Sequence, residues 1–368
     1  MNLRSLSLSA CLPLVCVALV FAGRAWAQPS VSLDVVYREP ADTFEILDNV
    51  SAWWPGYTEA VYREFWADSL GISAADSALF AQYTQLRERY FDKTGQNNED
   101  PRTSRSGLFT DRSILSADPV GFAFYASGSM DEAYGRLGDI VEPDELAFLR
   151  SFYEHFADRT APLTAETRRS TVASMARTRN TLSDSTLPAY LSGISTFFGV
   201  SEDATFTALY VWWPDADRIM ANPNGPFLLL RVRPYEGEAI NSADIVVHEA
   251  VHVVSAMQSE AQKRAVSDAI LATCSSALAQ TRRLGVIEEP LATVLGNIEF
   301  RRRFDPGRFS WSRSWYGEPW VDLSARVLYP VVMDALAAGE TIAGASFSVD
   351  AAASCKVVLD ATASQHEP

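Results

Sequence analysis

The chain has 368 residues, of which 48% are hydrophobic and 21% are charged, and this composition is typical of a globular protein with a substantial core. Its formal net charge of −15 argues against nucleic acids and anionic membranes as partners. The length predicts one large domain or two modest ones.

The N-terminal segment has the pattern of an export signal. Arg4 gives a basic start, residues 11–22 form an apolar run, and residues 25–27 (Ala-Trp-Ala) have the small-x-small form of a cleavage site. We therefore expect residues 1–27 to be a signal peptide. Without it, 341 residues with a formal charge of −17 remain. The lipobox-like residues 8–11 (Leu-Ser-Ala-Cys) offer a lipid anchor as the alternative, but the apolar run follows the cysteine instead of preceding it.

No later apolar stretch is long enough to span a bilayer, so we expect a periplasmic or extracellular protein without a membrane span. Cys274 and Cys355 are the cysteines that follow the signal peptide. In an oxidising compartment they are expected to form a disulfide that closes a loop of 81 residues, with two buried free thiols as the alternative.

Residues 28–200 are expected to form a mostly helical region. Apolar residues recur at intervals of three and four, and they predict helices at 59–70, 74–91, 144–158, 165–178 and 187–198. Residues 93–118 are rich in Asn, Asp, Arg, Ser and Gly and predict a long exposed loop. The region has no catalytic motif, and His155 is expected to be structural.

The pattern changes near residue 201, and residues 201–368 are expected to form a separate domain. Residues 205–213 predict a strand, residues 223–226 (Pro-Asn-Gly-Pro) a turn, and residues 227–233 a second strand with Arg231 and Arg233 on one face. We expect this second strand to form the edge of a substrate cleft, where an extended peptide adds to the sheet.

Residues 248–252 read His-Glu-Ala-Val-His, which has the form H-E-x-x-H. On a helix, positions i and i+4 share a face, so His248 and His252 can hold one Zn²⁺ while Glu249 takes a proton from a water. Such a string arises by accident in a chain of this length on the order of once in a hundred. The apolar neighbours predict a buried helix with Asn241 as N-cap and Asp244 in its first turn. Two unrelated surface histidines are the alternative.

A catalytic zinc requires a third protein ligand. His366 lies at the end of the chain, and no third histidine follows in the H-E-x-x-H-x-x-G-x-x-H arrangement. A carboxylate is left, and residues 288–292 read Glu-Glu-Pro-Leu-Ala.

Over residues 205–300 the chain resembles the gluzincins, the thermolysin-like and aminopeptidase-like zinc metallopeptidases. In these a glutamate on a later helix completes the site, often in a Glu-Gly-x-Ala string. Glu289 begins such a string, with Pro290 in the glycine position, 37 residues after His252. Because proline disfavours α geometry in the preceding residue, and because Glu288 is followed by an apolar helix face, Glu288 remains the rival ligand.

The resemblance implies a helix-rich α+β fold with a zincin-like catalytic core, in which a small sheet packs on the H-E-x-x-H helix. It also implies Zn²⁺ bound by His248, His252 and Glu289, with Glu249 as general base. Gluzincins commonly place a Tyr or His near the zinc to hydrogen-bond the oxyanion.

The candidates for the oxyanion role are Tyr329 and Tyr316. Residues 311–320 hold an aromatic cluster that is expected to form a cleft wall, a sugar-stacking platform or a packed cover of the core. Helices are expected at 262–283 and at 321–338, the latter broken or kinked at Pro330.

The sequence thus predicts an exported zinc metallopeptidase that acts on a peptide or protein. The alternatives are a different hydrolase that uses the same metal site and a non-catalytic extracellular binding protein with a structural zinc. The fourth metal position separates them, because it is open to a cleft in an enzyme and closed in a structural site.

Overall fold

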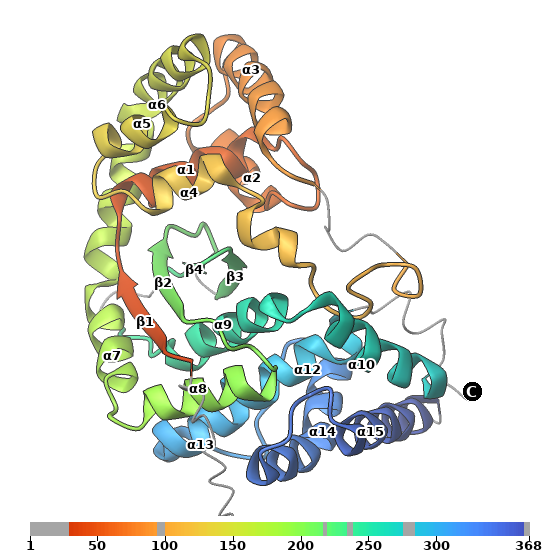
Figure 1. The fold of residues 1–368 in the computed structure, drawn as a ribbon. Helices are drawn as coiled ribbons and strands as arrows, with labels where there is room; N and C mark the ends of the chain where they lie inside the picture. The colour runs from red at the N-terminus through yellow and green to blue at the C-terminus, as the bar shows by residue number, and fades with distance from the viewer. Residues whose placement is uncertain (1–28, 94–99, 216–218, 234–237, 275–283, 364–368) are drawn as a thin grey trace, which may run out of the picture.

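A four-stranded mixed sheet lies at the centre of the computed structural model, which describes residues 29–93, 100–215, 219–233, 238–274 and 284–363 (Figure 1). The strand order is β1-β2-β4-β3. Three strands are parallel and β3 is antiparallel to its neighbour β4. The bounds are β1 Val31–Val36, β2 Ala204–Val211, β3 Met220–Asn224 and β4 Phe227–Arg231. The predicted strands at 205–213 and 227–233 are confirmed as β2 and β4, and the expected signal peptide lies outside the described residues.

The edge strand of the sheet is β3, so residues 227–233 do not form the sheet edge to which a peptide was expected to add. Turn-forming residues such as Asn222 and Pro223 concealed β3 in the sequence, and the predicted turn at 223–226 shrinks to Gly225 and Pro226. Proline lacks an N–H, so within a sheet it is tolerated at an edge. Gly225 has φ +58°, in the left-handed region that favours glycine.

Helices cover both faces of the sheet (Figure 1). Because side chains alternate along a strand, Leu228 and Leu230 of β4 join one core with the C-terminal helices. Leu229 between them joins a second core with the N-terminal helices. The strand β1, which comes from the part of the chain before residue 200, pairs with β2 in the same sheet. The division into domains at residue 200 stays a prediction.

The N-terminal layer is helical, as expected. Its helices are α1 (Glu39–Ser51), α2 (Ala60–Ser69), α3 (Ala74–Tyr90), α4 (Pro119–Tyr125), α5 (Met130–Leu137), α6 (Pro143–Ser170), α7 (Val172–Leu182) and α8 (Leu187–Phe197). The structure confirms the helices predicted at 59–70, 74–91 and 187–198. The helix predicted at 144–158 is confirmed within α6, which continues through Pro162. The helix predicted at 165–178 is corrected, because α6 ends at Ser170 and α7 begins at Val172.

Helix α1 was missed because it is buried on nearly every side, so acidic residues interrupt the apolar spacing of a single buried face. Asp42, Glu45 and Asp48 are all buried in it. His155 on α6 lies 2.8 Å from the Asp76 carboxylate, in the structural role expected of it.

The predicted exposed loop at 93–118 is also corrected within the described residues 100–118. Leu108, Phe109 and Thr110 are buried there. The Thr110 hydroxyl donates a hydrogen bond to the buried Glu288, so a polar residue of this segment does not indicate exposure. A short 3₁₀ helix, η1 (Arg112–Ser116), follows.

The C-terminal layer carries the predicted metal helix. Its elements are α9 (Ala243–Met257), α10 (Glu260–Thr273), α12 (Glu288–Ala292), the π-helical η2 (Thr293–Glu299), α13 (Phe300–Phe304), η3 (Pro306–Arg308), α14 (Pro319–Ala338) and α15 (Ala345–Ala363). α10 is shorter than the helix predicted at 262–283, and residues 275–283 lie outside the described part. α14 contains Pro330.

Cys274 and Cys355 form the expected disulfide, with their Cα atoms 6.1 Å apart. It joins the end of α10 to α15. Within the described ranges, no helix combines the length and the apolar character that crossing a membrane requires.

Candidate metal centre

Helix α9 is buried on nearly every side and is held by its packing between the sheet and the following helices. Its N-cap is Ser242 and not Asn241, although the Asn241 side chain accepts a hydrogen bond from the Ala243 N–H. Asp244 forms an ion pair of 2.6 Å with Arg301, so it ties α9 to α13 instead of reaching back to the cap. The helix is therefore anchored at the end that precedes its histidines.

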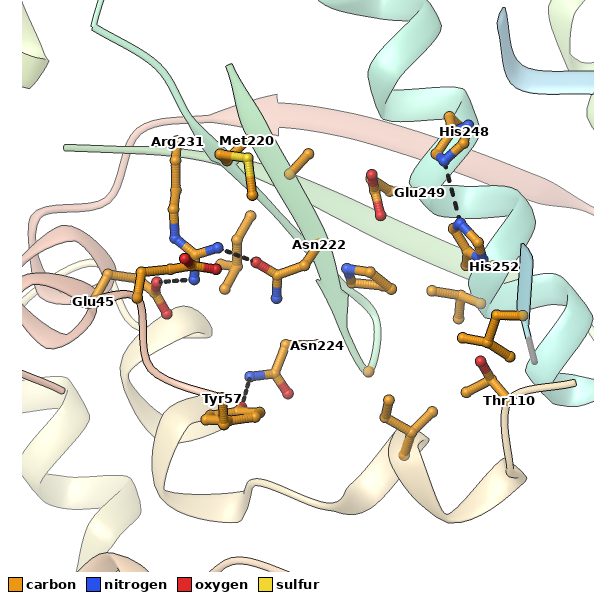
Figure 2. Close-up of a pocket in the computed structure, with 18 of the residues that line it drawn as sticks. Glu45, Tyr57, Thr110, Met220, Asn222, Asn224, Arg231, His248, Glu249 and His252 are labelled. Carbon is orange, nitrogen blue, oxygen red and sulfur yellow. Dashed lines mark hydrogen bonds and ion pairs between the residues drawn. The ribbon is translucent and has the colours of Figure 1, made fainter. Parts of the chain in front are cut away.

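The structure brings His248, His252 and Glu289 together, and they are a group that could hold a metal ion. The two Nε2 atoms are 3.2 Å apart (Figure 2). Glu289 Oε2 lies 3.5 Å from Nε2 of His248 and 3.4 Å from Nε2 of His252, and it is a buried oxygen without a hydrogen bond. Three potential ligand atoms therefore form a nearly equilateral triangle.

The hydrogen bonds of the outer ring nitrogens direct the two Nε2 atoms into the triangle. His248 Nδ1 lies 2.9 Å from Asn297 Oδ1, and His252 Nδ1 lies 2.9 Å from Glu288 Oε1. Both partners are acceptors, so both Nδ1 atoms donate, and in the neutral imidazoles both Nε2 atoms carry lone pairs. With both imidazoles neutral, the two lone pairs and the carboxylate oxygen repel one another, and either a proton on one Nε2 or a metal ion among the three atoms relieves this repulsion.

The triangle has the size that Zn²⁺ requires. With zinc–ligand bonds of about 2.0–2.1 Å in tetrahedral geometry, ligand atoms are separated by about 3.3 Å. The observed separations of 3.2, 3.4 and 3.5 Å match this value. Two imidazoles and one carboxylate are also the donor set of many catalytic zinc sites. The residues present therefore fit the metal.

Glu288 and Glu289 have different surroundings, although they are neighbours in the sequence. Glu288 is 1% exposed, and its two oxygens accept hydrogen bonds from the N–H and the hydroxyl of Thr110 at 2.6 and 2.8 Å. It also accepts from His252 Nδ1. Glu288 thus orients a metal-binding histidine, as carboxylates beside zinc sites commonly do, while Glu289 faces the triangle.

The charged groups of the cluster shift one another's pKa values. Burial opposes ionisation of Glu289, but the adjacent His252 and His248 bring the pKa of its carboxyl well below the ordinary value. Burial likewise opposes protonation of His252, but Glu289 and Glu288 bring its pKa well above the ordinary value. The site therefore carries negative charge that is compensated by a proton or by a metal ion.

Glu249 is buried beside the triangle, and its side chain is 6% exposed. Burial raises the pKa of its carboxyl, His248 and His252 lower it, and the charge of Glu289 raises it again. In Figure 2 its carboxylate lies next to the two histidines and extends toward the cavity. It is placed to exchange a proton with a molecule bound there.

A glycine that the sequence analysis did not single out allows the ligand helices to meet. A Cβ atom on Gly296 would lie 2.3 Å from the Cα of His248 and 2.4 Å from its backbone nitrogen. Gly296 belongs to η2, and π-helical turns within helices are frequent at functional sites. An isolated glycine within an apolar helical run was the available signal for this close approach.

Of the two tyrosines considered, the structure brings Tyr316 to the site. Its ring stacks on His248 with centroids 5.9 Å apart and an interplanar angle of 28°. Burial and the charge of Glu289 raise the pKa of Tyr316, so it keeps its proton as a donor. Tyr329 instead donates a hydrogen bond of 2.7 Å to Glu299, away from the triangle.

The triangle lies on the wall of a cavity of about 340 Å³. The cavity follows β3, with the histidines of α9 to one side of the strand and Glu45 and Arg231 to the other (Figure 2). The N-terminal layer contributes α1 residues and the segment 56–59 to its lining. A second cavity on the other side of His248 is lined by Ile219, Ile245 and the Trp315–Glu318 segment.

Comparison with known proteins gave no match: no protein-family model, curated protein or solved structure resembles this chain sufficiently to assign it.

Proposed function

We propose that the protein is an exported zinc-dependent metallopeptidase with a zincin-like core. The observation that carries the proposal is the triangle of His248, His252 and Glu289, which opens on a cavity beside the carboxylate of Glu249. An open cavity supports a catalytic site over a structural one, because a structural zinc is closed on all four sides by protein ligands. The disulfide supports an oxidising compartment.

The edge strand β3 supports a peptide as the substrate. A two-residue turn connects β3 to β4, and the residues that flank such a turn, here Asn224 and Phe227, form a hydrogen-bonded pair. By alternation, the backbone groups of Ala221 and Pro223 point away from β4. Ala221 therefore offers an N–H and a carbonyl to an added strand, and Pro223 offers a carbonyl only.

The chain's own residues divide the chemistry among them. Zinc, when bound, supplies a Lewis acid that polarises the scissile carbonyl and lowers the pKa of a water molecule. Glu249 accepts the proton of the attacking water and passes it to the leaving amine. Tyr316 donates its hydroxyl proton in a hydrogen bond to the carbonyl oxygen as negative charge develops there. Asn297 and Glu288 keep the imidazoles oriented.

The test compares the parent protein with Glu249→Gln and with Glu64→Gln, an exposed glutamate on α2. Elemental analysis should find zinc in all three. Digestion of a peptide library, read by mass spectrometry, should be abolished by a chelator and restored by Zn²⁺. Glu249→Gln should slow cleavage by about 10²–10⁴-fold, as loss of a general base does. Cleavage by Glu249→Gln at the parent rate, or a parent protein free of zinc, would contradict the proposal.

A further inference from the structure

We propose that Thr110 is a positioning residue of the metal centre, which acts through Glu288 to hold the imidazole of His252 in the orientation that zinc binding requires. The proposal rests on the proposed function, because it concerns the ligands of the same metal. It also makes the part of the chain before residue 200, in which no catalytic motif was found, a contributor to that centre.

Thr110 binds both oxygens of the Glu288 carboxylate. Its backbone N–H donates to Oε2 at 2.6 Å, and its hydroxyl donates to Oε1 at 2.8 Å. Because hydrogen bonds are directional, two donors, one on each oxygen, oppose rotation of the carboxylate about its last bond, whereas a single donor would permit it. The same Oε1 accepts from His252 Nδ1 at 2.9 Å, so the direction of this third hydrogen bond follows from the first two.

The contacts of Thr110 and Glu288 lie in the interior of the protein, since both residues are buried. A buried carboxylate oxygen that loses a hydrogen bond turns to whichever donor is within reach, because leaving it unpaired is costly. Within the described residues, the donors on this carboxylate are the two of Thr110 and the one of His252. Loss of the hydroxyl therefore frees the carboxylate to turn, and His252 with it.

The position of Thr110 is itself fixed by Lys263 of α10. The buried Nζ of Lys263 donates to the Thr110 carbonyl and to the Ala256 carbonyl, each at 2.9 Å. Ala256 lies one turn after His252 on α9. The hydrogen bonds thus form a closed ring, which runs from α9 through Lys263, Thr110 and Glu288 back to α9. No member of the ring can shift without stretching two of its bonds.

The residues before Thr110 are seated closely on α10. The Leu108 N–H donates to Ser267 Oγ at 2.8 Å. Gly107 has φ +59°, and a Cβ atom there would lie 2.2 Å from the same Oγ. A larger residue would collide with Ser267, so the glycine allows the backbone to reach the depth at which Thr110 meets Glu288.

The two histidines are held by different parts of the chain. Asn297 of η2 accepts a hydrogen bond from His248 Nδ1, and its amide nitrogen lies 3.4 Å from the Asp244 carbonyl. Neither contact involves Thr110. A change at Thr110 should therefore reach His252 and leave His248 unaffected, and His248 serves as a control within the same molecule.

The experiment compares the full-length parent with Thr110→Val, Thr110→Ser and Thr160→Val. Valine keeps the shape of threonine without its hydroxyl, and serine keeps the hydroxyl. Thr160 is a buried threonine of α6 whose hydroxyl bonds to the Phe156 carbonyl. A competition titration with a fluorescent chelator should show about tenfold weaker zinc binding by Thr110→Val, as loss of an outer partner of a metal ligand causes. Thr110→Ser and Thr160→Val should bind zinc as the parent does.

Nuclear magnetic resonance of the zinc-loaded proteins adds a measurement that a merely structural role would not change. In the parent, the Nδ1 protons of His248 and His252 should exchange slowly with water, because each is buried and hydrogen-bonded. Thr110→Val should speed the exchange of the His252 proton and leave that of the His248 proton unchanged. A general loss of stability would speed both.

The outcomes separate the positioning role from the activity. Zinc binding by Thr110→Val at the parent affinity or tighter, equal changes at both histidines, no recovery in Thr110→Ser, or the same loss in Thr160→Val overturns the role, even if the parent cleaves peptides. Weaker zinc binding with a change confined to His252, in a protein whose parent form cleaves no peptide, upholds the role and overturns the peptidase. A parent that binds no zinc overturns both.

Discussion

Two buried polar clusters of this protein differ in whether every charged group has a protein partner. In the N-terminal layer, Arg87 is 0% exposed and gives its guanidinium hydrogens to Asp48 and Asp118 at 2.6–2.9 Å. Its charge also lies over the Trp53 ring at 4.8 Å. Across the sheet, the Nε2 atoms of His248 and His252 and the Glu289 oxygen face one another, and their negative charge needs a proton or a metal ion to compensate it. A cluster in which every charge has a protein partner stabilises the fold, whereas a cluster that lacks one indicates a ligand.

The largest effect is expected at the unpartnered cluster. Glu289→Ala removes one of three protein ligands, and structural zinc sites contribute on the order of 10 kcal/mol, so zinc affinity should fall by several orders of magnitude. Zinc content after dialysis against a weak chelator measures the loss. The free energy of unfolding of the metal-free protein should change little in this variant. Retention of zinc by Glu289→Ala would place the third ligand elsewhere.

Substitution in the Arg87 cluster should lower the stability of the fold and leave zinc binding unchanged. Arg87→Met leaves two buried carboxylates without their cation and should lower the free energy of unfolding by about 3–5 kcal/mol. Denaturant unfolding of the metal-free protein measures this change. Arg89→Met, at an exposed ion pair with Glu145, is the control and should cost about 1 kcal/mol or less. Zinc binding by the folded Arg87→Met protein should be unchanged, and a loss of zinc there would break the distinction between the clusters.

Glu288 is fully paired with protein groups and also contacts His252, so its substitution should change zinc affinity by an intermediate amount. Glu288→Gln keeps the shape of the side chain but weakens its hold on His252. Loss of such a partner typically costs about 10–100-fold in metal affinity. A competition titration with a fluorescent chelator resolves this range. A loss as large as that of Glu289→Ala would make Glu288 the ligand.

The smallest effect concerns Asp42, a buried carboxylate with neutral partners. It accepts hydrogen bonds from the Trp212 N–H at 2.5 Å and the Tyr37 hydroxyl at 3.3 Å. Burial raises its pKa to about 7. The folded state therefore holds a proton that the unfolded state releases above about pH 4, and this contribution to stability is lost as the pH rises toward 7.

Because unfolding releases the Asp42 proton, the free energy of unfolding should fall by about 1.4 kcal/mol between pH 5 and pH 6. Asp42→Asn should remove that part of the slope, measured by urea unfolding of the metal-free protein at both pH values. Equal slopes in parent and variant would show that the charges around Asp42 already hold it ionised.

The residues of the cluster that the sequence analysis named were marked by short strings, and the disulfide was marked by the number of cysteines. His248 and His252 are one helical turn apart, so their common face follows from helix geometry alone. Glu289 followed from a short string, and the structure places it with the histidines. The disulfide followed from there being two cysteines after the expected signal peptide.

The residues that were missed act across long separations. Thr110 is 178 residues from Glu288, and no local pattern marks either as a partner of the other. Asn297 and Gly296 sit in a π-helical turn, whose register a 3.6-residue period does not describe. The edge strand β3 was concealed because the fixed φ of Pro223 suggests a turn, although its missing N–H is tolerated at a sheet edge.

The parallel pairing of β1 with β2 also has a kinetic consequence. It joins Val31 to Ala204, a separation of 204 − 31 = 173 residues, so the sheet closes only after both distant segments are present. Contacts of such separation are slow to form, because the entropy of closing the loop is lost before the contacts compensate for it. We therefore expect the sheet to form late in folding, with the residues of the candidate metal centre, which follow β2 in the chain, among the last parts to be ordered.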